Sequence, residues 1–223
     1  MARGVCIYCK QEKKKITRDH VPPQGLLGKP LPKDTITVPS CRGCNQNFSN
    51  DDQYFRDCLM SMRIVENHPV VKKQRKKTMR GFRRKESLGY AKEFISRVEL
   101  KEVHSPGGVY LGQFPVFTTD DNRILDTITR IAKGLYYEEG KGLIPDGFIT
   151  TARFIRQEVL NDENIKIVLN ELASINPRIV GDDVLAYSMV STPENRTAFM
   201  IRFYGKLLFF AVIGPESDLL LGS

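Results

Sequence analysis

Residues near the start of the chain combine two kinds of metal chemistry. Two Cys-x2-Cys pairs have the spacing of a tetrahedral zinc site, and their members are Cys6, Cys9, Cys41 and Cys44. Asp19 and His20 lie between the pairs, and Asn45 directly follows the last cysteine. Carboxylate and amide oxygens bind harder cations such as Mg²⁺, and an imidazole can take a proton from water. These residues therefore predict a structural zinc ion beside a hydrolytic centre.

Two simpler interpretations of the cysteines compete with zinc. One pair alone would fit a thioredoxin-like redox motif, but the residues around Cys6 and Cys9 lack a strand-turn-helix frame, and the second pair would be unexplained. Four core cysteines at this spacing would be a coincidence. Because residues 4–50 are rich in Lys, Pro and Gly, metal ligation has to replace apolar burial there.

Short secondary-structure elements must bring these side chains together. The expected order is strand, loop, strand and helix, over residues 15–21, 24–33, 35–38 and 41–48. Pro22 and Pro23 stop the first strand because proline cannot continue a central strand, and β-branched residues favour the second. This order would direct Asp19, His20 and Asn45 toward one point.

The pattern resembles the HNH, or ββα-metal, endonucleases, in the four-cysteine branch that includes phage Holliday-junction resolvases. The resemblance covers residues 6 to about 55. It implies that Asp19 and Asn45 hold a catalytic Mg²⁺ or Mn²⁺ ion, that His20 is the general base, and that the four cysteines hold zinc. It further implies DNA hydrolysis to 5′-phosphate and 3′-hydroxyl ends, and RNA is not excluded as a substrate.

One position departs from the family pattern. Many members have a middle Asn about five residues before the second cysteine pair, which helps to orient the base, whereas Ile36 stands there in this chain. Asp34 or a loop carbonyl is left to orient His20. Each residue also has a structural alternative: Asp19 as a turn cap, His20 as a surface imidazole, and Asn45 as a partner for backbone groups at a helix start.

The next segment predicts a helix and then a basic connector. Apolar residues recur at helical spacing over 51–67, after Ser49 or Asn50 as a helix cap. Cys58 belongs to the apolar face and is expected in the core, and His68, before a proline, is expected to be structural or on the surface.

Residues 70–85 contain many cations and no acid. Such runs are usually solvated surface or mobile linker, but beside a nuclease centre they favour contact with the DNA backbone. The residues expected to bind nucleic acid in this run are Lys72, Lys73, Arg75, Lys76, Lys77, Arg80, Arg83 and Arg84. Lys13, Lys14, Lys15 and Arg42 flank the cysteines and are expected to add to the same track, with little base reading.

The chain changes character near residue 94. Strands are expected over 96–103 and 109–118, and helices over 120–139 and 161–174. The last strands, over 184–190, 198–203 and 207–213, predict an antiparallel sheet packed on the helix over 120–139. The role of this part is not readable from its residues.

The whole chain therefore predicts an α+β protein. The expected parts are a zinc-stabilised ββα-metal finger over 1–55, a helical basic connector over 56–93 and an α+β domain with an antiparallel sheet over 94–223. The net charge of +8 is concentrated in the first half, and the second half is net acidic, which suggests a polyanion partner for the first half.

Two function classes stay open. One is a metal-dependent DNA endonuclease. The other is a non-catalytic zinc module that binds nucleic acid and recruits a partner through its C-terminal part, which could also form a homodimer. No apolar run approaches the roughly 20 residues of a membrane span, and no signal-peptide core precedes residue 15, so we expect a cytoplasmic protein without membrane contact.

Overall fold

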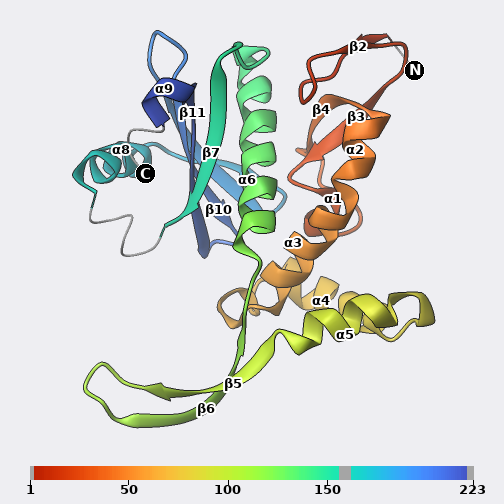
Figure 1. The fold of residues 1–223 in the computed structure, drawn as a ribbon, viewed down its shortest axis with the longest axis vertical. Coiled ribbons are helices and arrows are strands. Elements are labelled where there is room, and N and C mark those ends of the chain that lie inside the picture. Colours follow the sequence, from red (N-terminus) through yellow and green to blue (C-terminus); the bar gives the residue numbers. More distant parts are fainter. Residues whose placement is uncertain (1–2, 156–161, 220–223) are drawn as a thin grey trace.

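A computed structural model describes residues 3–155 and 162–219 (Figure 1). Its described residues form a mixed α+β fold in which every strand pairing is antiparallel. This confirms the predicted fold class in its coarse form. No helix in the described ranges is both long enough and apolar enough to cross a membrane.

The N-terminal segment forms two small hairpins around the cysteines. The strands are β1 (Gly4–Val5), β2 (Glu12–Lys13), β3 (Ile16–Val21) and β4 (Ile36–Cys41). The loop between β3 and β4 holds the short helix α1 (Gln24–Leu27), and α2 (Arg42–Asn47) follows β4 at once. The predicted order of strand, loop, strand and helix is therefore present, and the second strand continues further than predicted, to Cys41.

Three helices make up the region that was predicted as a helix and a basic connector. They are α3 (Ser49–Ser61), α4 (Pro69–Phe82) and α5 (Leu88–Ser96). The capping prediction was wrong, because the N-cap of α3 is Phe48 and makes no side-chain cap bond. The predicted helix over 51–67 also ends early, since Met62 is extended and Arg63–Val65 forms a 3-10 turn. Pro69 starts α4, where its missing N–H costs nothing.

A long hairpin separates these helices from the C-terminal part. Its strands are β5 (Val98–His104) and β6 (Tyr110–Phe117), close to the predicted bounds. Figure 1 shows this hairpin extending away from the rest of the molecule. The chain then enters α6 (Asp121–Tyr136), where the Asp120 carboxylate caps the helix by accepting from the Arg123 N–H.

The largest sheet has five strands in the order β7-β11-β10-β9-β8. Their bounds are β7 (Phe148–Phe154), β8 (Arg178–Val180), β9 (Leu185–Ser191), β10 (Thr197–Phe203) and β11 (Leu207–Pro215). The outer strands β7 and β8 were not predicted. The sheet packs on α6, as predicted.

The two faces of the sheet carry different helices. On β11, Phe209 and Ala211 belong to the main core with α6, whereas Phe210 packs with Leu172 of α8 (Glu163–Ser174). Successive side chains of β11 therefore point to opposite faces of the sheet, one face packed on α6 and the other on α8. The first residue of the predicted helix over 161–174 lies outside the described residues. A short helix, α9 (Glu216–Leu219), ends the described chain.

One continuous core joins the N-terminal hairpin to the C-terminal sheet. Val21 of β3 and Leu26 of α1 belong to the same buried cluster as Phe199 and Phe203 of β10. Helix α6 lies between the large sheet and the N-terminal elements (Figure 1). The Tyr204 hydroxyl also donates to the Leu26 carbonyl at 3.2 Å. The domain boundaries at 55 and 93 stay a prediction, but buried residues on both sides of them pack together.

Candidate metal centre and adjoining site

The four predicted zinc ligands lie together. Their sulfur atoms are all within 4.8 Å of one another, and none is in a disulfide. Thiolates about 2.3 Å from a tetrahedral zinc ion lie about 3.8 Å apart, and the Cys9 and Cys41 sulfurs are 3.9 Å apart. The cluster has the residue types and spacing to hold one zinc ion.

Two tight turns present these sulfurs. Cys6 and Cys9 lie in the turn between β1 and β2, where the Cys6 N–H donates to the Gln11 carbonyl at 3.1 Å and Lys10 takes a positive φ of 57°. Cys41 ends β4, and its sulfur caps α2 by accepting from the Cys44 N–H at 3.4 Å. Each pair therefore needs only a few residues to point both thiols at one centre.

The surroundings of the thiols favour ligation. Burial by itself raises the pKa of Cys6, but backbone amides of Cys9, Cys41 and Tyr8 bond its sulfur, and the pKa falls from 9.0 to about 7. Burial and the neighbouring thiols raise the pKa of Cys44. A cation at the centre would oppose that rise, because metal binding requires the deprotonated form.

Asp19, predicted to be a cation ligand, forms an ion pair with a buried arginine side chain. Its side chain is 6% exposed, and Oδ2 accepts from the Tyr8 hydroxyl at 2.6 Å and from Arg130 Nη1 at 2.9 Å. Arg130, from α6, also pairs with Asp52 of α3 and lies 4.5 Å from the centre of the Phe48 ring. One guanidinium thus serves two carboxylates.

This sharing affects the ionisation of the second carboxylate. The pKa of Asp52 is raised to about 6, chiefly by burial. Arg130 opposes this rise, and the nearby charges of Asp19 and Asp51 add to it. Burial is also the main cause that raises the pKa of Tyr8, followed by the charge of Asp19. At neutral pH Tyr8 is therefore a hydrogen-bond donor.

Asn45 lies on the same face of the hairpin as Asp19. Its Nδ2 donates to Thr17 Oγ1 at 3.3 Å and lies 3.5 Å from the Arg18 carbonyl. Because side chains alternate along a strand, Thr17 and Asp19 share one face of β3. The amide nitrogen is used in these contacts, so the amide oxygen is the atom that can serve as a ligand.

His20 lies on the other face. It follows Asp19 in β3 and pairs with Thr37 of β4, so strand alternation directs it away from Asp19. Its ring is half-buried. Ile36, at the position of the missing middle Asn, is buried against the core. Asp34, one candidate to orient His20, instead accepts from the Gly181 N–H at 3.0 Å.

Two expectations outside the centre agree with the structure. Cys58 is completely buried in the core. His68 is structural: its Nε2 lies 3.1 Å from the Asp182 carbonyl, and its ring packs 5.0 Å from that of Tyr204.

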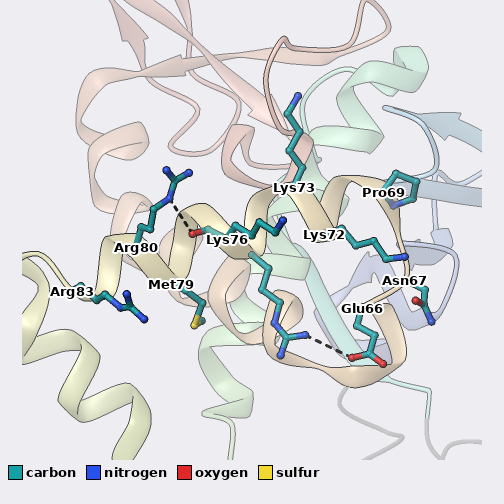
Figure 2. A pocket seen from close by; sticks show the side chains of 10 residues that line it. Glu66, Asn67, Pro69, Lys72, Lys73, Lys76, Met79, Arg80 and Arg83 are labelled. Carbon is teal, nitrogen blue, oxygen red and sulfur yellow. Dashed lines mark hydrogen bonds and ion pairs between the residues drawn. The ribbon is translucent and has the colours of Figure 1, made fainter.

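Most of the basic residues of the connector lie on helix α4, and the connector is not a loose linker. A groove of about 1250 Å³ runs along α4, and Figure 2 shows Lys72, Lys76, Arg80 and Arg83 around it. Arg75 pairs with Glu66 at 3.7 Å. Within the part of the chain that the structure describes, the other cations of α4 have no acidic partner, so this surface carries a concentrated positive charge.

The basic residues near the cysteines are separate from this groove. Lys13 is on β2 and Arg42 starts α2, whereas α4 lies beyond the far end of α3 (Figure 1). Helix α3 has 13 residues, which corresponds to about 20 Å.

The residues around Asp19 that sequence reasoning missed are Tyr8, Asp52 and Arg130. No local pattern in the sequence pointed to any of the three. Arg130 is buried in α6 beside Ile131, where a charged residue needs a partner, but this burial is visible only in the structure. Comparisons with protein-family models, with curated proteins and with solved structures found no match for this chain, so its site stands on geometry alone.

Proposed function

We propose that the protein is a metal-dependent endonuclease of the HNH type that hydrolyses DNA. The observation that carries the proposal is the position of Asn45. The cysteine cluster fixes Cys44 in the first turn of α2, and the next residue contacts Thr17 on the face of β3 that carries Asp19. A carboxylate and an amide oxygen on one face are the ligand types that a hard divalent cation prefers, which supports the proposal.

In this proposal the side chains have distinct roles. The four cysteines hold a zinc ion that fixes the hairpins in place of a larger core. Asp19 and Asn45 hold Mg²⁺ or Mn²⁺, which when bound acts as a Lewis acid on the phosphate oxygens. His20 accepts the proton of the attacking water, which suits an imidazole at neutral pH. Because His20 lies across β3 from Asp19, its ring has to reach the same phosphate around the strand.

The charges around Arg130 are consistent with such a cation. With both carboxylates ionised, Asp19, Asp52 and Arg130 carry one net negative charge. A divalent cation would change this to one net positive charge, and a phosphodiester would then neutralise it. The second carboxylate thus lets the centre accept a cation although a guanidinium is already present.

A second function keeps a specific observation in its favour. Asp19 is already satisfied by Tyr8 and Arg130, and His20 faces away from it. Both facts suit a non-catalytic zinc module that binds nucleic acid through α4. In that case Asp19 is a structural residue that joins β3 to α6, and no cation is needed beside it.

Plasmid nicking separates the two functions. Purified protein is incubated with supercoiled DNA and Mg²⁺ or Mn²⁺, next to His20→Ala and His104→Ala variants. His104 is the matched control because it lies on the β5–β6 hairpin, outside the site. We expect nicking by the native chain and by His104→Ala, and a loss of about 10²-fold or more in His20→Ala.

Two results would contradict parts of this proposal. Equal nicking by His20→Ala would show a nuclease in which His20 is not the base. DNA binding without nicking under any divalent cation, with zinc present in the protein, would favour the binding module. Binding is measured on the same preparations, so that a misfolded variant is recognised.

A further inference from the structure

The β5–β6 hairpin exposes apolar side chains far from the core. Figure 1 shows it as an extended arm, and no other strand in the described ranges pairs with it. Its exposed apolar residues are Val98, Leu100, Val109, Tyr110 and Leu111. Leu100 is 67% exposed, although it lies in the middle of β5. A two-stranded hairpin of this kind is marginal alone, and open apolar strands are templates for pairing with another chain.

The two outer edges of the arm differ. The Thr118 N–H donates to the Arg97 carbonyl at 3.0 Å, which makes this pair hydrogen-bonded. Since bonded and non-bonded pairs alternate, the Leu100 pair with Pro115 is non-bonded. The backbone groups of Leu100 therefore point outward, to the free edge of β5.

The edge of β6 is protected. Pro115 is directly opposite Leu100, so the N–H that would point outward from β6 is absent. The register also shifts beyond Val103, where Gly112 has a positive φ of 116°. Prolines and irregularities of this kind block edge pairing. Only the β5 edge is free of them, so an added strand is expected there.

We propose that β5 pairs with β5 of a second copy of this chain, antiparallel and with Leu100 on the two-fold axis. In this register Glu99 is opposite Lys101 of the second copy, and the symmetric pair repeats the contact. Opposite charges across a strand pair are favourable, and like charges are unfavourable. Within one chain Lys101 Nζ and Glu99 Oε2 are already 3.9 Å apart. In the dimer, Glu99 and Lys101 of the two copies would therefore form a cluster of four charges in which each has neighbours of opposite sign.

Other registers are worse for the same strand. An axis at Glu99, Lys101 or Glu102 places two like charges opposite each other. An axis at either end leaves few residues of β5 to pair. The Leu100 register alone combines opposite charges with outward-pointing backbone groups, and it buries Leu100 against its copy in a four-stranded sheet.

The test is the oligomeric state of the full chain, measured by sedimentation equilibrium. We expect a mass of twice 25.4 kDa for the native protein. Glu99→Lys and Lys101→Glu should each raise the dimer dissociation constant by about tenfold or more, because each places like charges opposite one another twice. The double variant restores the opposite charges and should dimerise like the native chain. Glu86→Lys, an exposed site outside the arm, is the control for the charge change.

Three results would overturn the proposal: a native chain that stays at 25.4 kDa, single variants that dimerise as tightly as the native chain, or a double variant no better than the singles. Circular dichroism verifies that each variant is folded. The proposal does not depend on the nuclease, since His20 is not on the arm and His20→Ala should keep the native mass.

Discussion

Replacing Arg130 by methionine tests the charge arrangement beside the metal centre. Arg130 is 6% exposed, and its guanidinium joins Asp19 of β3 to Asp52 of α3. Methionine keeps much of the apolar volume over Phe48 but removes the charge. The variant therefore leaves two carboxylates without a cation while the packing changes little.

The size of the effect follows from the exposure of the two carboxylates. Removing one partner of a buried ion pair typically costs about 3–5 kcal/mol, because an uncompensated charge stays buried. The Asp19 side chain is 6% exposed, but that of Asp52 is 23% exposed and keeps part of its hydration. We therefore expect a loss near the lower limit, about 3 kcal/mol in the free energy of unfolding at pH 7.

The pH dependence of the stability loss is a second, independent test of the same charge arrangement. The pKa of Asp52 is already raised to about 6 by burial, with Arg130 opposing the rise, so loss of Arg130 raises it further. A carboxyl with a raised pKa in the folded state contributes stability below its unfolded pKa of about 4. This contribution is lost as the pH rises through the folded pKa. The unfolded states of the two chains are the same, so the gap that Asp52 causes between Arg130→Met and the native chain depends on the two folded pKa values alone. It should close as the pH falls below about 6, where Asp52 is protonated in both folded chains, and grow as the pH rises through the higher pKa of the variant.

Urea unfolding followed by far-UV circular dichroism measures both effects, since the chain has no tryptophan. Adding Asp52→Asn to Arg130→Met should recover part of the loss. Arg83→Met, at the exposed residue that follows α4, is the control and should change stability by about 0.5 kcal/mol or less. A loss below about 1 kcal/mol in Arg130→Met, with no change in pH dependence, would refute the idea that a buried cation is needed there.

Three further changes test other parts of the structure. Cys44→Ser should abolish the zinc content measured by atomic absorption, whereas Cys58→Ser should retain one zinc ion per chain; equal metal loss in both would contradict the four-cysteine site. Lys76→Ala should weaken DNA binding at all sequences and lower the salt slope by about one, measured by anisotropy at several salt concentrations, and an unchanged slope would exclude a phosphate contact. Gly134→Ala should destabilise by about 1–3 kcal/mol in urea, because the new Cβ would lie 2.5 Å from the valine that ends β3. Gly89→Ala in α5 meets no atom within 4 Å and should not destabilise; an equally tolerated Gly134→Ala would contradict this packing.

The sequence predicted the local features that depend on nearby residues. The two cysteine pairs, the hairpin around Asp19 and the helix over Asp121–Tyr136 each follow from short spacing patterns. The strands over 198–203 and 207–213 follow from short apolar runs rich in residues that favour strands.

The missed features depend on distant residues. Strand β7 is half-buried along most of its length and lacks a clear alternation of apolar and polar residues, so its pairing with β11 decides its structure. The Asp19 contact with Arg130 joins residues 111 positions apart, and no local pattern reports it. Alternation along β3 places His20 and Asp19 on opposite sides, but which side faces the protein interior is decided by packing against α6.

The packing of β3 on α6 limits how this chain can be divided. A fragment ending after α3 would expose Val21, which packs against Gly134, and would leave Asp19 and Asp52 without their guanidinium. Supplying zinc to such a fragment would repair neither defect. For grafting, for recombination between homologues or for a minimal version of the site, the smallest transferable unit therefore extends through α6 and the sheet behind it.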